Sequence, residues 1–191
     1  MAILLDMDGV LCDFVKSACV AFNFDPDDVY RNWKPGVYDV AEVFGINNAG
    51  GWDGQEKLWA TIDARGEYFW ATLPEYRWSR ELYDECSKFD DIYFLTSPTR
   101  NPSCASGKLK WIQAFMGNKA ASNFLIGPAK HLCARQDNVL IDDYEYNVDK
   151  FRDAGGKAIL FPQPWNRLGR IEYPVVTVMK ELREIYDKKA D

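Results

Sequence analysis

Apolar residues gather in five short runs that have the length of buried β-strands. Between the later runs, apolar residues recur at helical spacing, which predicts helices over 78–89, 107–117, 145–156 and 175–189. Strands that alternate with helices indicate βαβ units and a parallel sheet. The five predicted strands cover residues 2–6, 91–97, 123–127, 138–143 and 157–161.

A different pattern fills the chain between the first two predicted strands. Residues 15–76 contain no convincing strand, but several stretches have helical spacing. Asp25 followed by Pro26 is typical of a helix N-terminus, and residues 46–54 are predicted to form a loop. We therefore expect a small helical domain at 15–76, inserted into an α/β core with a five-stranded parallel sheet. The predicted core domain consists of residues 1–14 and 77–191.

The net charge, the longest apolar stretches and the cysteine count narrow the class of protein further. A net charge of −6 without any basic block makes a nucleic-acid polymer an unexpected partner. No stretch approaches about 18 apolar residues, and no basic segment leads into a long apolar run, so we expect neither a membrane span nor secretion. The five cysteines are scattered and form no CxxC pair, which favours a reducing compartment. We expect a cytoplasmic protein, and a homodimer is compatible with the sequence.

Polar residues capable of chemistry follow four of the five predicted strands. The first strand ends in Asp6 and Asp8, whose side chains would point to the same side of an extended chain. Two carboxylates about 4 Å apart repel by roughly 4 kcal/mol at an effective dielectric constant of about 20. This segment is therefore either a solvated, capped turn or a cation site. The later strands are followed by Thr96, Ser97, Lys130, Asp142 and Asp143.

These groups would meet because ligands of open parallel sheets bind beyond the carboxyl ends of the strands. Oxygen ligands without nearby His or Cys favour Mg²⁺ over zinc or copper. One aspartate would attack phosphorus, and a second, two residues on, would protonate the leaving oxygen and later activate water. Thr96 and Ser97 offer donors to phosphate oxygens. Lys130 offers a positive charge, although Lys108, Lys110 or Lys119 could take that role.

Four segments carry a family resemblance. DMDGV (6–10), FLTSP (94–98), Lys130 and LIDDYEYNVD (140–149) resemble, in order, the four motifs of the haloacid dehalogenase-like (HAD) hydrolases. The resemblance implies a Rossmann-like three-layer core with a C1-type cap. It also implies that Asp6 is the nucleophile and Asp8 the general acid and base. Thr96 and Lys130 would hold the phosphoryl group. The implied Mg²⁺ ligands are Asp6, the backbone carbonyl of Asp8, Asp142 and Asp143.

Within that superfamily, DMDGVLCDF, FLTSP and the small cap most resemble the 5'(3')-deoxyribonucleotidases. The resemblance implies that Phe14 lines a base pocket together with aromatic residues of the cap, because nucleobases stack on aromatic rings. Close relatives often carry an arginine after the paired aspartates, where this chain has Tyr144, so recognition of phosphate or sugar can differ. The candidate substrate-binding residues are Phe14, Trp33, Trp52, Phe69, Trp70 and Ser97.

The sequence thus predicts a Mg²⁺-dependent phosphatase that acts on a nucleoside monophosphate, with a pyrimidine deoxyribonucleotide preferred, through an aspartyl-phosphate. One alternative keeps the chemistry but changes the substrate to a sugar phosphate or a 3'-phosphorylated nucleic-acid end. Another alternative is a phosphate-binding module without turnover, which would not need both Asp6 and Asp8. Halide removal from carbon is disfavoured because that chemistry needs neither Asp8 nor a dication.

Overall fold

The computed structural model describes residues 2–46, 52–117 and 122–187. In this part of the chain, five parallel strands form one sheet in the order β3-β2-β1-β4-β5. The α/β fold with a five-stranded parallel sheet is therefore confirmed. The strands are β1 (Ala2–Leu5), β2 (Asp91–Thr96), β3 (Phe124–Ile126), β4 (Asn138–Asp142) and β5 (Lys157–Leu160).

The helices of the core connect these strands and follow the last one. They are α6 (Ser79–Ser87), α7 (Pro102–Met116), the short 3₁₀-helix η2 (Lys130–Cys133), α8 (Glu145–Asp153) and α9 (Pro174–Asp187). Helix α7 begins five residues earlier than the sequence pattern predicted. The reason is local, because Asn101 caps the helix by accepting a hydrogen bond from the Ser103 amide at 3.0 Å, and Pro102 occupies the first turn.

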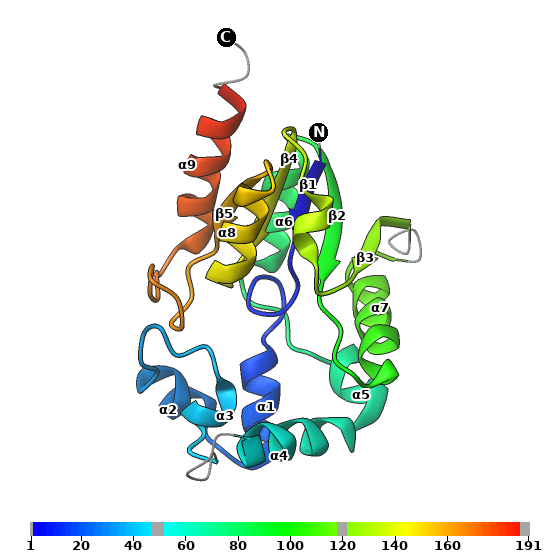
Figure 1. Cartoon of the computed structure of the whole chain (residues 1–191), viewed down its shortest axis with the longest axis vertical. Coiled ribbons are helices and arrows are strands. Elements are labelled where there is room, and N and C mark those ends of the chain that lie inside the picture. Colours follow the sequence, from blue (N-terminus) through cyan, green and yellow to red (C-terminus); the bar gives the residue numbers. More distant parts are fainter. Residues whose placement is uncertain (1, 47–51, 118–121, 188–191) are drawn as a thin grey trace.

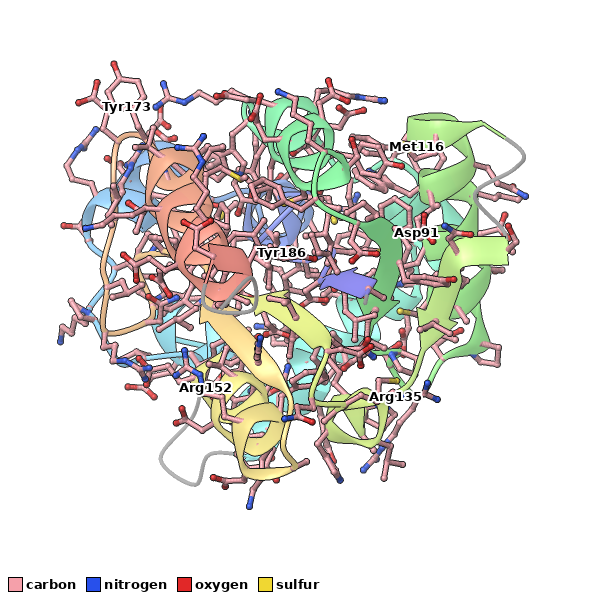
Figure 2. All side chains as sticks on the ribbon, turned by 90° about the horizontal axis from the view of Figure 1, so that it is seen from above. Asp91, Met116, Arg135, Arg152, Tyr173 and Tyr186 are labelled. Carbon is pink, nitrogen blue, oxygen red and sulfur yellow. The ribbon has the colours of Figure 1, made fainter. Side chains whose placement is uncertain are left out.

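Strand β1 lies at the centre of the sheet, and its side chains alternate between two hydrophobic layers. Ile3 and Leu5 belong to a large cluster that includes residues of α6, α7 and α9, whereas Leu4 packs in a smaller cluster with Val148 and Phe151 of α8. Seen from above, α9 with Tyr186 and α8 with Arg152 lie on opposite sides of the sheet (Figure 2). The core thus has three layers.

In the described residues between β1 and α6 lie five further helices. They are α1 (Phe14–Phe22), α2 (Pro26–Arg31), α3 (Val40–Val43), α4 (Trp52–Asp63) and α5 (Gly66–Ala71). They lie beyond the carboxyl ends of the strands, as Figure 1 shows. Asp25 caps α2, and its side chain accepts a hydrogen bond from the Asp27 amide at 2.9 Å, as the Asp-Pro pair predicted. The loop predicted at 46–54 is too long, because α4 already begins at Trp52; residues 47–51 lie outside the described part.

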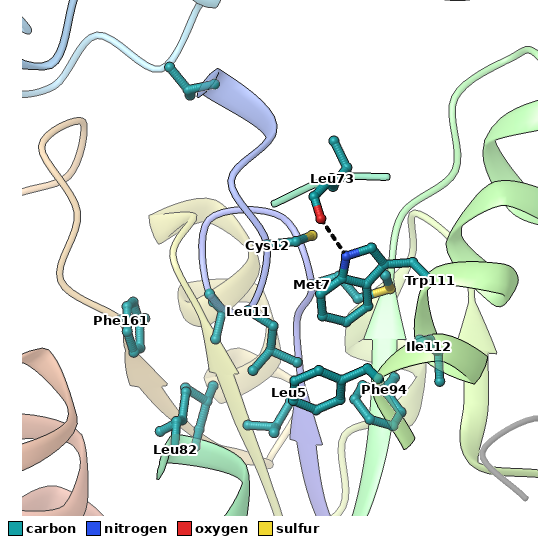
Figure 3. Packing of buried hydrophobic residues seen from close by; sticks show 14 of the residues in the cluster. Leu5, Met7, Leu11, Cys12, Leu73, Leu82, Phe94, Trp111, Ile112 and Phe161 are labelled. Carbon is teal, nitrogen blue, oxygen red and sulfur yellow. Dashed lines mark hydrogen bonds between the residues drawn. The ribbon is translucent and has the colours of Figure 1, made fainter. Parts of the chain in front are cut away.

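Helix α5 packs closely on α7, which belongs to the core. Gly107 of α7 approaches α5 so closely that a Cβ atom there would lie 2.5 Å from Cβ of Trp70 and 2.6 Å from the carbonyl oxygen of Glu67. The indole nitrogen of Trp111 also donates a hydrogen bond to the carbonyl of Leu73 at 2.7 Å (Figure 3). Helix α5, the last helix of the predicted cap, is therefore packed firmly on the core. The domain boundaries at 15 and 76 stay a prediction.

Candidate active site

The loop after β1 is shaped by its own backbone. The carbonyl of Met7 accepts hydrogen bonds from the amides of Val10, Leu11 and Cys12 at 3.2, 2.8 and 2.9 Å. Gly9 in this loop has a φ of +77°, and a Cβ atom there would lie 2.3 Å from Oδ2 of Asp143. Position 9 therefore requires glycine for two reasons, the left-handed backbone and the close approach of Asp143.

Three carboxylates meet at the carboxyl ends of β1 and β4. Asp6, Asp142 and Asp143 each offer an oxygen, and these oxygens lie within 4.8 Å of one another. The register explains the meeting, because Leu5 pairs with Ile141 and the Asp6 amide bonds to the Ile141 carbonyl at 3.0 Å. All three side chains are buried. The expected convergence of acidic groups at one edge of the sheet is thus present.

Lys130 of η2 lies among these carboxylates. Its Nζ is 2.8 Å from Oδ1 of Asp6 and donates a hydrogen bond to Oδ2 of Asp142 at 2.7 Å. Burial alone would lower the pKa of Lys130, but the two carboxylates raise it above its ordinary value. The lysine is therefore held in its charged form. When ionised, the three carboxylates and this ammonium group leave two excess negative charges.

Asp143 has the environment of an incomplete ligand site. Its Oδ2 accepts a hydrogen bond from the indole nitrogen of Trp165 at 2.6 Å, but its Oδ1 is buried and has no hydrogen-bond partner among the described residues. Burial, followed by the charges of Asp142 and Asp6, raises the pKa of Asp143 well above its ordinary value. A dication among these oxygens would satisfy Oδ1 and offset the two excess charges. The residues present therefore fit Mg²⁺.

Asp142 is bound from several directions by the chain itself. Its Oδ1 accepts the Tyr144 amide at 2.9 Å, and the Asn147 amide group lies 3.2 and 3.1 Å from Oδ1 and Oδ2. Together with Lys130, these donors hold the carboxylate in one orientation. Asn147 belongs to the segment 140–149 that resembled a HAD motif, but the spacing alone gave it no role.

Asp8 pairs with a different lysine. Nζ of Lys108, in α7, lies 2.5 Å from Oδ2 of Asp8, 2.8 Å from Oγ1 of Thr96 and 2.7 Å from the carbonyl oxygen of Ser97. Lys108 and Lys130 are both almost fully buried. The sequence left Lys108 as an alternative to Lys130. The structure places both lysines beside carboxylates, but Lys108 pairs with Asp8, whereas Lys130 pairs with Asp6 and Asp142. Lys110 instead lies on the surface beside Glu67, and Lys119 is outside the described residues.

A cavity of about 1020 Å³ opens beside these groups. Asp8, Ser97, Lys108 and Asp143 line it, whereas Asp6 is buried next to them. Its remaining wall combines aromatic and aliphatic side chains with polar and charged ones, which include Asp39, Glu56, Asp63 and Arg100. The aromatic residues that line it are Phe14, Trp33, Tyr38, Trp59, Trp70, Tyr76, Tyr144 and Trp165.

The predicted aromatic residues fall into three groups. Phe14, Trp33 and Trp70 line the cavity, and Phe14 stacks on Trp70 with the ring centroids 5.7 Å apart; their contact with a substrate stays a prediction. Phe69 does not line it. Its buried ring packs edge-on against Phe14 and Trp70, which indicates packing rather than the predicted contact with substrate. Trp52 begins α4, but its side chain lies outside the described residues.

Comparison with known families identifies the chain at this point. Residues 1–177 match the family described as 5' nucleotidase, deoxy (pyrimidine), cytosolic type C protein (NT5C). The chain belongs to the NT5C family. No match was found among curated proteins.

Solved structures with the fold of this NT5C-family chain include hydrolases. A hydrolase from Streptococcus pneumoniae TIGR4 is 16% identical, with a TM-score of 0.53 over 95% of this chain and 97% of that one. A HAD-superfamily hydrolase, subfamily IA, variant 1, from Geobacter sulfurreducens PCA is 15% identical, with a TM-score of 0.53 over 93% and 94%. A protein described as a predicted phosphatase from Clostridium acetobutylicum is 16% identical, with a TM-score of 0.52 over 96% and 98%. The NT5C-family chain thus shares its fold with a HAD-superfamily hydrolase and with a predicted phosphatase.

Some site residues of this NT5C-family chain escaped the sequence analysis. Trp165 donates a hydrogen bond from its indole nitrogen to Asp143 and lines the cavity. Tyr38 stacks on Tyr144 with the ring centroids 3.9 Å apart, so an inserted segment and the segment after β4 meet at the cavity. Aromatic residues make up 15% of the sequence, but only the fold shows which of them face the cavity. Among the described residues, no helix is long and apolar enough to span a membrane.

Proposed function

We propose that this NT5C-family chain removes the phosphate from nucleoside monophosphates, with an aspartyl-phosphate as intermediate. One observation carries the proposal. The cluster of Asp6, Asp142 and Asp143 adjoins Asp8 beside a cavity whose wall contains eight aromatic residues together with polar, acidic and aliphatic ones. The charged cluster suits a phosphate ester and its metal, and the aromatic residues suit a base.

Asp6 is the proposed nucleophile. Within the described residues, Oδ1 of Asp6 accepts a hydrogen bond from the Met7 amide at 2.7 Å and lies 2.8 Å from Nζ of Lys130, while Oδ2 has neither contact. Oδ2 is therefore the oxygen that attacks phosphorus. Lys130 uses two of its three N–H groups on Asp6 and Asp142, so the third is available for a phosphoryl oxygen. This arrangement supports the assignment of Lys130 to the phosphoryl group.

Asp8 is the proposed general acid and base. It lines the cavity, and about 30% of its side chain is exposed, so a leaving oxygen or a water can reach it. Its proton goes to the leaving oxygen in the first step, and a proton returns from water in the second. Mg²⁺ held by Asp6, Asp142, Asp143 and the Asp8 carbonyl would supply charge stabilisation for the phosphoryl group.

The size and lining of the cavity support a mononucleotide. Small-molecule sites commonly enclose about 300–1,000 Å³, and the cavity of about 1020 Å³ is large enough for a base, a sugar and a phosphate. Stacking of a base on an aromatic ring contributes about 1–3 kcal/mol. Phe14 and Trp59 offer such rings, whereas Trp70 is buried and already packs on Phe14. A sugar phosphate would leave these rings without a partner, so the nucleotide is the better candidate.

A turnover panel tests the proposal. The purified protein with Mg²⁺ is assayed for phosphate release from purine and pyrimidine ribo- and deoxyribonucleoside monophosphates, from sugar phosphates and from p-nitrophenyl phosphate. We expect the highest kcat/KM for a nucleoside monophosphate. A sugar phosphate with the highest value would instead favour the alternative substrate class, and no release from any ester would indicate a binding module.

Asp6→Asn tests the nucleophile in the same assay. We expect activity to vanish while the circular dichroism spectrum stays that of the wild type, because the amide is isosteric but does not attack phosphorus. Asp149→Asn, on the exposed side of α8, is the matched control and should keep full activity. Retained activity of Asp6→Asn would reject the assignment.

A further inference from the structure

Lys108 has a hydrogen-bond acceptor for each of its three N–H groups. These acceptors are Oδ2 of Asp8 at 2.5 Å, Oγ1 of Thr96 at 2.8 Å and the Ser97 carbonyl at 2.7 Å. An ammonium group has only three N–H donors, so none remains for a substrate oxygen unless one of these bonds breaks. Only Asp8 among the three acceptors carries a charge, so the ion pair of Lys108 is made with Asp8 alone.

The position of Lys108 is fixed from outside the catalytic loop. Its Nζ lies 5.2 Å from the centre of the Trp70 ring, which is a cation–π distance. The preceding residue, Gly107, is in close contact with Trp70 and Glu67 of α5. Thr96 and Ser97 extend from β2, the neighbour of β1 in the sheet. The ammonium group is thus held by two elements that are distant in sequence from Asp8.

We propose that Lys108 is a positioning residue that holds the Asp8 carboxyl group in the orientation needed for proton transfer. This inference rests on the proposed function, because it concerns the acid and base of that reaction. Lys130 contacts the substrate in this scheme, and Lys108 acts through Asp8. The two buried lysines therefore have different tasks, although either could have been the motif lysine in the sequence.

The reaction step shows where the effect must appear. An oxygen of Asp6 bonds to phosphorus, the ester P–O bond breaks, and the leaving oxygen takes the proton carried by Asp8, so the alcohol departs neutral. Water then replaces Asp6 on phosphorus and gives a proton to Asp8. A sugar alkoxide is strongly basic and needs the proton early, whereas p-nitrophenolate leaves readily without it. Misplacement of Asp8 therefore slows nucleotides more than p-nitrophenyl phosphate.

Lys108→Met tests this difference, because it keeps a long side chain and removes the charge and the donors. We expect kcat for a nucleoside monophosphate to fall about 100-fold and kcat for p-nitrophenyl phosphate to fall less than about tenfold, since general acid catalysis contributes about 10²–10⁴-fold. Asp8→Asn should show the same selectivity, and the double variant should be no slower than Asp8→Asn. Lys110→Met, on the exposed face of the same helix, should match the wild type.

Equal losses on both substrates, with weaker inhibition by inorganic phosphate, would overturn the inference and assign Lys108 to phosphoryl binding. If Lys108→Met does not fold by circular dichroism, Lys108→Arg decides, because a guanidinium keeps the charge but, being larger and planar, does not reproduce the three hydrogen bonds of the ammonium group and so displaces the Asp8 carboxyl group. This variant should lose more activity on the nucleotide than on p-nitrophenyl phosphate, and a uniform loss would overturn the inference.

If the wild type hydrolyses alkyl phosphates but no nucleotide, the proposed function fails, and glycerol phosphate replaces the nucleotide in this test. A wild type inert toward every ester overturns both.

Discussion

Gly107→Ala is the substitution whose outcome the structure defines most sharply. In an isolated helix this change would stabilise α7 by about 1 kcal/mol, because alanine is the better helix former. In the folded protein the new Cβ would lie 2.5 Å from Cβ of Trp70, 2.6 Å from the Glu67 carbonyl oxygen and 3.2 Å from the Ala71 amide nitrogen. These atoms belong to the backbone or lie next to it, so no rotamer change relieves the overlap.

The magnitude follows from this contact. Helix α5 must retreat by about 1 Å to restore ordinary van der Waals distances. Overpacking of this kind costs about 1–3 kcal/mol and occasionally more. The retreat also strains the buried hydrogen bond from Trp111 to the Leu73 carbonyl, and such a bond contributes about 1 kcal/mol. After the gain in helix propensity is deducted, we expect the free energy of unfolding to fall by about 2 kcal/mol.

Thermal unfolding followed by circular dichroism measures the effect. For a chain of this length, 1 kcal/mol shifts Tm by about 2–4 °C, so Gly107→Ala should melt about 4–8 °C below the wild type. Gly127→Ala is the matched control, because a Cβ there meets no atom within 4 Å and its φ lies outside the left-handed region. A Gly107→Ala variant that melts at or above the wild-type Tm would refute the packing of α5 on α7.

Three other properties can be tested separately. Mg²⁺ at about 100 times its Kd should stabilise the wild type by about 2.7 kcal/mol, while Asp143→Asn should gain far less; an equal rise in Tm would remove Asp143 from the metal site. Phe14→Ala should lower kcat/KM about tenfold for a nucleoside monophosphate, because a stacking surface is lost, but less than about threefold for p-nitrophenyl phosphate; equal losses would make that ring a packing residue only. An aromatic disulfide that reacts with thiols should modify one cysteine quickly in the native protein and all five after denaturation. The reactive residue should be Cys133, because it is half-buried, whereas burial raises the pKa of the other four thiols. Fast reaction of a second thiol in the native protein would contradict this. The protected residues are Cys12, Cys19, Cys86 and Cys104.

Local patterns were sufficient for most elements of the fold. Each apolar run at a predicted strand became a strand, and four of these strands are largely buried, whereas the edge strand β3 is mostly exposed. Asp25 with Pro26 marked the start of α2 correctly. The start of α7 was missed, since the signal was a cap at Asn101 rather than a hydrophobic period.

The sequence by itself determined the kinds of groups at the strand ends and their order along the chain. It placed Asp6 and Asp8 after the first strand and Asp142 and Asp143 after the fourth, and neighbouring parallel strands bring such ends together. It could not determine that Lys108 pairs with Asp8 while Lys130 pairs with Asp6 and Asp142, or that Trp165 bonds to Asp143. Only the tertiary structure decided these contacts, because strand order and helix packing bring together residues that can be about 100 positions apart. A pattern of neighbouring residues does not indicate which distant side chains will form a pair.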